Sequence, residues 1–375
     1  MQRDRPPSVG DHTGETMDRD GSSMNLTART ALAAALLALG GVASAAFADD
    51  NQSRNPSSGM TPDLNDPRIS GDFDYGVCRG TNPKCYHDWV DSRQNKVLLY
   101  TRTAGPRHAN LGTALGPGLN PPLNTGANPN TVQTTLMAWL EAEGIAMDWT
   151  EDVNQLASSL GPSSRYKAVI FASTSRDTLW KHGTAIAPTS AVNTTTGAHL
   201  DAAKTAVRQF MRAGGGFVAI HNAFGTEYNW PYYEGLLGNA NYYDHGQFQD
   251  GTVETIARDP STDGLPGRWA FKDEWYNLVP FPTKVKFLLL IDEDTLATKR
   301  STHPGHGKFH PVAWCQYYDG GRAFLTTLGH DRAAFTDGAG FPGQEYFKKL
   351  IVQGIKSAMG LTAFCTGDSS GKDRD

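Results

Sequence analysis

The chain has 375 residues, with 34 Lys and Arg against 39 Asp and Glu, and a formal net charge of −5. The chain is slightly acidic and has no cluster of Lys and Arg. The sequence therefore predicts neither a nucleic-acid partner nor electrostatic attachment to an anionic membrane surface. The length is sufficient for one α/β domain with a substantial core.

Residues 24–48 are typical of a secretory signal peptide. Arg29 supplies the positive charge, residues 31–42 form the apolar stretch, and Ala46-Phe47-Ala48 is an A-x-A cleavage site. The apolar stretch is too short to span a membrane. The sequence therefore predicts a secreted, extracellular protein that is cleaved after Ala48, with no stable membrane insertion, and assigns residues 1–48 to an N-terminal extension and signal.

The four cysteines favour one disulfide bond and leave another open. Residues 49–95 are rich in Asn, Asp, Ser, Pro and Gly and predict an irregular arm, in which Cys78 and Cys85 lie close together. Export permits disulfides, so this pair is predicted to be bonded. Cys315 lies in an apolar run and is predicted to be a buried thiol. A bond between Cys315 and Cys365 is the alternative, since four cysteines allow three pairings.

Strands and helices alternate in the first half of the predicted domain, residues 96–361. Apolar runs predict buried strands, and helical spacing predicts a helix that Asn130 caps and Gly144 ends, followed by a second helix. This alternation favours a doubly wound parallel sheet. The predicted strands are 96–100, 146–149, 168–171 and 217–220, and the predicted helices are 130–143 and 201–212.

The second half is richer in strands and ends in a helix. Gly320 and Gly321 separate the last two predicted strands, which indicates a hairpin. Residues 362–375 are polar and are predicted to be a disordered tail. The predicted strands are 253–256, 285–291, 311–318 and 323–328, and the closing helix is 344–359.

His221 is the most informative residue of the chain. It follows the glycine run Gly214–Gly216 and the apolar strand, at the carboxyl end where open α/β sheets bind ligands. Hydrolases with a nucleophile elbow carry Ser or Cys at such a position. None of the four cysteines follows this strand, so the sequence disfavours thiolate chemistry such as glutamine amidotransfer.

Three residues are the candidate catalytic groups. His330 follows another predicted strand, as His221 does, and Glu274 stands next to Asp273. Paired carboxylates can raise one another's pKa and create a general acid, while imidazole suits a base near neutral pH. We therefore expect catalysis by His221, Glu274 and His330. No cofactor follows with certainty, but zinc bound by His221, His245 and His330 is the alternative.

Aromatic and carboxylate side chains recur near these histidines, as expected for a site that binds sugars. Glu227 precedes Trp230, and Glu274 precedes Trp275 and Tyr276. Residues after the first strand should also reach the carboxyl edge of the sheet. The candidate substrate-binding residues are Arg102, His108, Glu227, Trp230, Trp275, Tyr276 and His310.

Several segments of residues 96–361 occur together in a characteristic order and spacing. They are Thr101–Gly105 with Arg107-His108, Gly214–His221, Thr226–Pro231, Asp273–Asn277, His310–Cys315, Gly320–Arg322 and Leu328–His330. In combination they resemble the ThuA-like (trehalose utilisation) family. The resemblance implies a class I glutamine amidotransferase-like fold, a flavodoxin-like three-layer α/β/α sandwich with a mostly parallel sheet. It also implies a role in sugar catabolism.

The resulting hypothesis is an exported enzyme whose partner is a small-molecule carbohydrate. It would act on glycosides or oxidised (3-keto) sugars by acid–base chemistry of His and Glu. The alternatives are a zinc-dependent hydrolase that uses the same histidines and a non-catalytic sugar-binding protein. A homo-oligomer is compatible with the sequence. Asn222 stands where many relatives have Ser, and Gly246 where Pro is common, so the substrate is left open.

Overall fold

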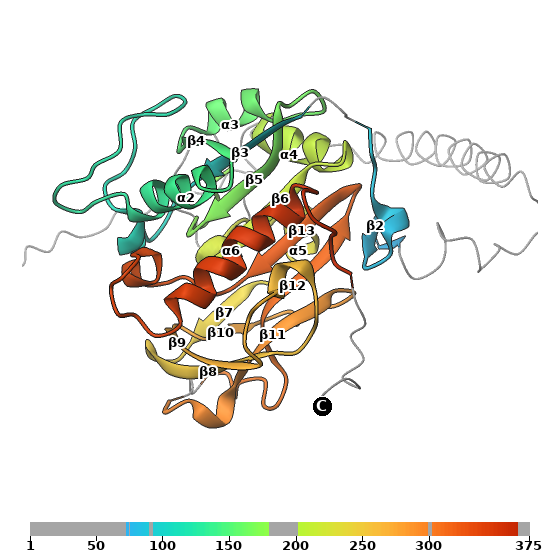
Figure 1. Cartoon of the computed structure of the whole chain (residues 1–375). Coiled ribbons are helices and arrows are strands. Elements are labelled where there is room, and N and C mark those ends of the chain that lie inside the picture. Colours follow the sequence, from blue (N-terminus) through green and yellow to red (C-terminus); the bar gives the residue numbers. More distant parts are fainter. Residues whose placement is uncertain (1–72, 75, 90–92, 180–201, 299–301, 367–375) are drawn as a thin grey trace, which may run out of the picture. The chain divides into compact units, whose positions relative to one another are not determined.

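An 11-stranded mixed sheet forms the centre of the computed structural model, which describes residues 73–74, 76–89, 93–179, 202–298 and 302–366 (Figure 1). Its main path runs β4-β3-β5-β6-β13-β12-β11-β8-β9. The strands are β1 (Phe73–Asp74), β2 (Val77–Gly80), β3 (Gln94–Tyr100), β4 (Ala146–Thr150), β5 (Tyr166–Ala172), β6 (Gly216–Ile220), β7 (Tyr242–His245), β8 (Gln249–Thr255), β9 (Arg268–Asp273), β10 (Tyr276–Leu278), β11 (Lys286–Asp292), β12 (His310–Tyr318) and β13 (Gly321–Thr326).

The five strands from β4 to β13 pair in parallel, and they deliver their carboxyl ends to one edge. β3, β4, β5 and β6 correspond to the four strands expected in the first half. The short apolar runs of β3, β5 and β6 are buried from both sides, as inner parallel strands require, whereas β4 ends the path and is partly exposed.

Beyond β13 the sheet continues in antiparallel pairs. β12 and β13 form the expected hairpin, with Tyr318 paired to Gly321 across a turn in which Gly320 has a positive φ of 93°. β11, β8 and β9 extend the sheet further. β7 and β10, which were not expected, form a separate two-stranded sheet.

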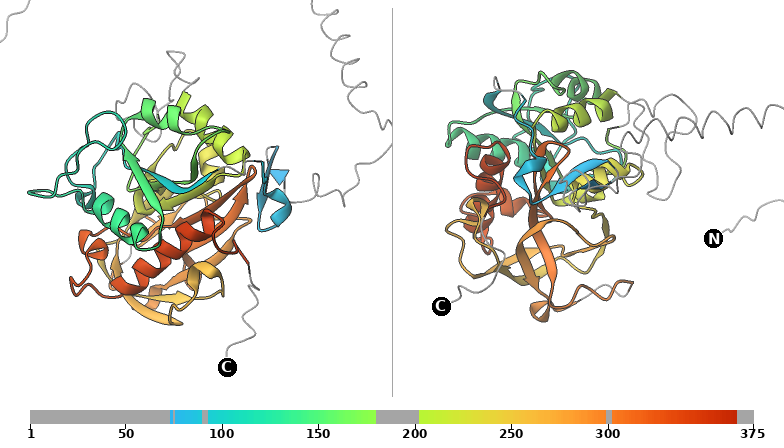
Figure 2. Two further views of the ribbon diagram at one scale, coloured as in Figure 1. Left: turned by 45° about the horizontal axis from the view of Figure 1, so that its top comes forward. Right: turned by 90° about the vertical axis from the view of Figure 1, so that its right-hand side faces the viewer.

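Helices cover both faces of the sheet, which gives the expected three α/β/α layers and confirms the α/β fold class (Figure 2). In β3, Val97 and Leu99 pack with one set of helices while Leu98 and Tyr100 pack with the other, because alternate residues of a strand face opposite sides. One face carries α2 (Thr131–Glu141) and α6 (Gln344–Ala358), and the other carries α3 (Val153–Ser159), α4 (Ala202–Arg212) and α5 (Pro231–Leu236).

Asn130 precedes α2 as expected, but its side chain does not cap the helix. Asn130 stands at the N-cap but its side chain makes no capping hydrogen bond. Its amide instead donates to the carbonyls of Leu111 and Thr113, at 2.6 Å each, and accepts from the backbone N–H of Asn124 at 2.7 Å. Asn130 therefore ties down the long loop that precedes the helix. Gly144 ends the helix as expected, with φ 70°.

The arm before β3 is more regular than predicted. The predicted Cys78–Cys85 disulfide is present. Arg79 and Gly80 of β2 pair with the C-terminal end of β12. The prediction of an irregular arm is therefore wrong for these residues, because a pairing with a distant strand leaves no local pattern in the sequence. Residues 49–72, like the predicted signal, lie outside the described residues.

The carboxyl end corrects two predictions. Cys315 is bonded to Cys365, so it is not the buried thiol that its apolar surroundings suggested. Phe364 and Cys365 are buried, and Phe364 packs against Tyr317 with ring centroids 5.0 Å apart. The predicted disordered tail is therefore wrong for residues 362–366, while residues 367–375 lie outside the described residues.

The two disulfides are consistent with an extracellular protein. Among the described residues, every helix is too short or too polar to cross a lipid bilayer.

Candidate functional site

His221 occupies a strained position directly after β6. It is completely buried and has a φ of 53°, a left-handed conformation that non-glycine residues adopt rarely and that often marks a functional site. Its Nδ1 lies 3.0 Å from the carbonyl oxygen of Thr327, which can only accept, so Nδ1 carries the hydrogen. Nε2 consequently has the lone pair, and it accepts a hydrogen bond from the hydroxyl of Tyr276 at 2.8 Å.

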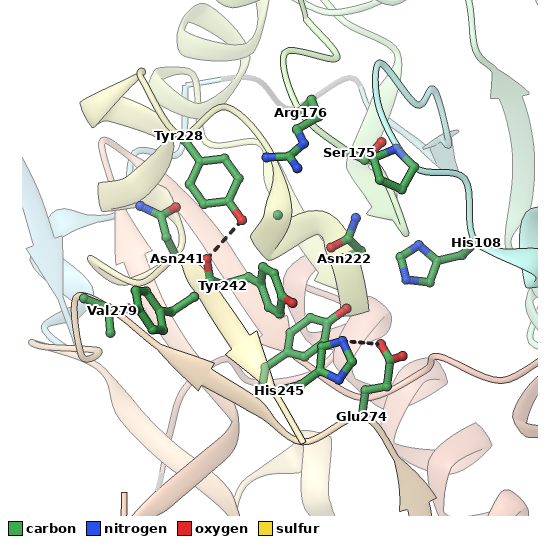
Figure 3. A pocket seen from close by; sticks show the side chains of 14 residues that line it. His108, Ser175, Arg176, Asn222, Tyr228, Asn241, Tyr242, His245, Glu274 and Val279 are labelled. Carbon is green, nitrogen blue, oxygen red and sulfur yellow. Dashed lines mark hydrogen bonds and ion pairs between the residues drawn. The ribbon is translucent and has the colours of Figure 1, made fainter. Parts of the chain in front are cut away.

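Glu274 brings the other titratable groups together. It lies between β9 and β10, and its Oε2 is 3.1 Å from Nδ1 of His330, which comes from the loop after β13. The same oxygen lies 3.6 Å from Nε2 of His245 (Figure 3) and 3.9 Å from Nε2 of His221. The two strand-end histidines and the carboxylate predicted to be catalytic thus converge.

His108 completes this group from the loop after β3. Its ring meets those of His221 and His330 edge-on, with centroids 4.7 and 5.3 Å away. Its Nδ1 is buried and has no hydrogen-bond partner among the described residues. We refer to His108, His221, Glu274 and His330 as the histidine cluster, whose potential ligand atoms lie within 4.8 Å of one another.

The histidine cluster combines neutral and charged groups. Burial lowers the pKa of His108 to about 4, and burial together with His108 and His330 holds the pKa of His221 well below its usual range. Burial would raise the pKa of Glu274, but the contact with His330 outweighs it and the pKa falls. The same contact raises the pKa of His330 against the effect of its burial. The neutral imidazoles of His108 and His221 therefore stand beside an ionised carboxylate and a histidine that is protonated more readily than usual.

Asp273 connects the backbone at Glu274 with the backbone at His330. Its fully buried carboxylate accepts hydrogen bonds from the backbone N–H groups of Gly329 at 2.7 Å, Glu274 at 2.8 Å and His330 at 3.2 Å. Burial raises its pKa to about 7, although these hydrogen bonds act in the opposite direction. The predicted pair of carboxylates thus separates into one buried positioning group and one group that faces the pocket.

His108 and Glu274 of the histidine cluster line a pocket of about 660 Å³, a size typical of small-molecule sites, while His221 and His330 lie behind this lining. Four tyrosines supply most of the aromatic lining, and Arg176 and Asn222 face the same space (Figure 3). The pocket is lined by Pro106, His108, Ser175, Arg176, Asn222, Gly225, Tyr228, Asn241, Tyr242, Tyr243, His245, Glu274, Tyr276 and Val279.

Of the predicted substrate-binding residues, His108 and Tyr276 line the pocket. Trp275 does not, because neighbouring residues of an extended chain face opposite sides: Glu274 and Tyr276 face the pocket, and Trp275 is buried with its Nε1 donating to the Gln249 carbonyl at 3.2 Å. Trp230 stacks on Tyr232, with centroids 5.2 Å apart, away from the pocket lining.

The remaining three predicted residues have partners within the protein. Glu227 is buried, forms an ion pair with Lys204 at 2.9 Å and accepts from the backbone N–H of Leu179 at 2.7 Å. Arg102 donates to the Thr178 carbonyl. His310 is buried behind Tyr276, whose carbonyl its Nε2 contacts at 2.9 Å, and its Nδ1 lies 2.7 Å from Glu293. These contacts point to structural rather than ligand-binding roles.

Sequence reasoning missed two groups of the pocket. Arg176 follows β5, and the general rule that ligands bind at the carboxyl ends of parallel strands could have indicated it. Tyr242 and Tyr243 lie on β7, a short strand whose pairing with β10 is non-local and leaves no signal in the sequence.

The histidine cluster also has the composition of a divalent-metal site. Three imidazoles and one carboxylate suit zinc or a similar ion, and the hydrogen bond of His221 Nδ1 to Thr327 resembles the outer contact that orients metal-binding histidines. The set differs from the predicted one, since His108 and Glu274 replace His245. A cysteine nucleophile is excluded, because all four cysteines form disulfides.

Comparison with known proteins relates residues 96–356 to a family model, ThuA, described as trehalose utilisation. Among solved structures, a ThuA-like protein of Parabacteroides merdae is 16% identical, with 74% of this chain and 99% of that chain covered and a TM-score of 0.45. A cytoplasmic protein of Salmonella typhimurium is 11% identical (70% and 99% covered, TM-score 0.45). A glutamine amidotransferase of Thermotoga maritima is 9% identical (71% and 99% covered, TM-score 0.39). No curated protein sequence matches the chain.

Proposed function

We propose that the chain, which belongs to the ThuA family, is an exported enzyme that acts on glycosides or their 3-keto forms by acid–base chemistry. The description of the family, trehalose utilisation, is a carbohydrate-related role. The observation that carries the proposal is the contact of Glu274 with His330, 3.1 Å apart beside the pocket, within a group of neutral histidines. The predicted signal and the two disulfides support export.

A 3-keto glycoside offers a reaction suited to these groups. The carbonyl makes the neighbouring C2–H bond acidic, so a carboxylate such as Glu274 can remove that proton. The electron pair left at C2 forms a double bond to C1, and the bond from C1 to the glycosidic oxygen breaks. His330, whose pKa is raised, supplies the proton that the departing oxygen takes up.

The other residues of the histidine cluster would assist this elimination. His221 is completely buried, so we assign it the role of holding the hydroxyl of Tyr276 in the pocket rather than contact with substrate. His108 borders the pocket in its neutral form. The aromatic rings of Tyr228 and Tyr242 offer flat surfaces on which the apolar C–H face of a sugar can stack.

A metal-dependent hydrolase is the second candidate, and the mutual distances within the histidine cluster favour it. His108, His221, Glu274 and His330 would hold the ion, and a bound zinc would supply a water molecule of lowered pKa. The unpartnered Nδ1 of His108 agrees with this reading.

Elemental analysis and activity of the same untagged, exported preparation test both candidates. We expect turnover of a 3-keto glycoside without stoichiometric metal, and a decrease in kcat of at least about a hundredfold in Glu274→Gln, which removes the base but keeps the side-chain size. Glu345→Gln, at an exposed position of α6, is the matched control. One metal per chain, with activity lost to a chelator, would select the hydrolase. Sugar affinity without turnover of either substrate form would identify a binding protein.

A further inference from the structure

Arg176 lies in the segment after β5, which forms one end of the pocket, and its backbone is held rigidly there. Its backbone has a φ of 59°, a left-handed conformation that is unfavourable for a non-glycine residue. Two neighbouring segments enforce this conformation: the Arg176 N–H donates to the Gly225 carbonyl at 2.9 Å, and the Arg176 carbonyl accepts from the N–H of Glu227 at 3.0 Å. An isolated β-bridge to Thr226 reinforces these bonds. The direction of this side chain is therefore fixed by the fold.

Gly105 makes room for the Arg176 side chain. A Cβ atom placed on Gly105 would lie 2.3 Å from Cγ of Arg176, well inside any permitted contact. The N–H of Gly105 donates to Oγ of Ser175 at 3.1 Å, which keeps the two segments together. The stem of Arg176 thus lies against a backbone surface while its guanidinium extends into the pocket (Figure 3).

The charge of Arg176 acts on the neighbouring carboxyl group of Asp177, but no described residue contacts the guanidinium directly. Its guanidinium forms no ion pair or hydrogen bond with any residue that the structure describes. Glu274, the carboxylate that lines the pocket, is in contact with His330 and His245, and the nearby Glu227 is paired with Lys204. A half-buried cation in such surroundings is best stabilised by an anion that arrives with the ligand.

We propose that Arg176 binds a carboxylate of the substrate, so that the pocket takes acidic sugars such as uronic-acid glycosides in preference to neutral ones. This inference rests on the proposed function, which assigns a sugar to the pocket. The planar fork of a guanidinium matches a carboxylate through two parallel hydrogen bonds. A phosphate would require more positive charge, and Arg176 is the one Lys or Arg among the residues that line the pocket.

Binding of inert probes tests the inference separately from catalysis. Titration calorimetry with methyl glucuronide, methyl galacturonide and the corresponding neutral methyl glycosides compares wild type with Arg176→Gln. We expect wild type to bind one uronide at least tenfold more tightly than its neutral counterpart, and Arg176→Gln to lose this preference while it still binds the neutral sugar. Gly105→Val should reduce the preference without removing the charge, because it displaces the Arg176 side chain.

The controls separate the possible outcomes. Arg258→Gln removes an exposed arginine that lies outside the pocket lining and should leave the preference unchanged, and circular dichroism reports the folding of each variant. Equal affinities in wild type, a preference that persists in Arg176→Gln, or binding of no probe would each overturn the inference. Uronide binding that depends on Arg176 but occurs without turnover would contradict the proposed function alone. Turnover without acid preference would contradict only the inference.

Discussion

The disulfide between Cys315 and Cys365 should contribute more to stability than the one between Cys78 and Cys85. The bonded residues are 50 positions apart in the first pair and 7 in the second. With the chain-entropy relation for loop closure, these separations correspond to about 4 and about 2 kcal/mol. Folded domains have a free energy of unfolding of about 5–15 kcal/mol, so the longer loop accounts for a large part of it.

Cys365→Ala isolates this contribution. The remaining Cys315 is buried and behaves as a small apolar side chain, so the substitution leaves no polar group without a partner. Urea denaturation followed by tryptophan fluorescence measures the effect. With a denaturant slope of about 3 kcal/mol per molar, a loss of about 4 kcal/mol lowers the midpoint by more than about 1 M.

Two comparisons make the test decisive. Cys78→Ala should lower the free energy of unfolding by about half as much, because its loop is shorter. In the presence of a reductant, wild type and Cys365→Ala should denature at similar urea concentrations. A smaller effect for Cys365→Ala than for Cys78→Ala would refute the reasoning from loop length.

Three further predictions concern single residues. Tyr276→Phe removes the hydroxyl bonded to His221 and should lower kcat about tenfold with little change in KM; steady-state rates that match wild type would contradict its role. Burial would raise the pKa of the Asp148 carboxyl, but its contact with Lys96 at 2.7 Å and hydrogen bonds from Tyr166 and Asn120 outweigh burial and lower it. A lowered folded-state pKa stabilises above the unfolded value of about 3.9 and is lost as pH falls through the folded value, so the stability difference between wild type and Asp148→Asn should shrink below about pH 3.9 in urea titrations. Gly354→Ala should destabilise by about 1–3 kcal/mol in thermal denaturation, because its Cβ would lie 2.2 Å from the buried ring of Phe324; an unchanged Tm would show that α6 can shift.

Local patterns predicted the parallel half of the fold. The short apolar runs of β3, β5 and β6 have no other stable location than a sheet covered on both faces. The positions of His221 and His330 after strands followed from these runs, and their convergence on Glu274 required the three-dimensional structure. The ThuA resemblance predicted the α/β fold class in the same way, through motifs at strand ends.

The sequence could not reveal which side of the chain each aromatic residue faces. Trp275 and Glu227 looked like sugar-binding groups because each stands in a segment of carboxylates and rings. In the structure Trp275 is directed inward by strand alternation, and Glu227 is enclosed by Lys204 and the Leu179 backbone. The Cys315–Cys365 bond likewise depends on how the chain end folds back, a contact without any periodic signature.

The strand order has a consequence for how the chain reaches its native state. β13 inserts between β6 and β12, and the contact of His221 with Thr327 joins positions 106 residues apart. Closing so long a loop is slow, and until it happens β6 and β12 both expose unpaired backbone that another molecule can capture. We therefore expect refolding to be slow, with aggregation as a competing reaction that increases with protein concentration. A chain can avoid aggregation only when its C-terminal half is intact, because that half supplies β13.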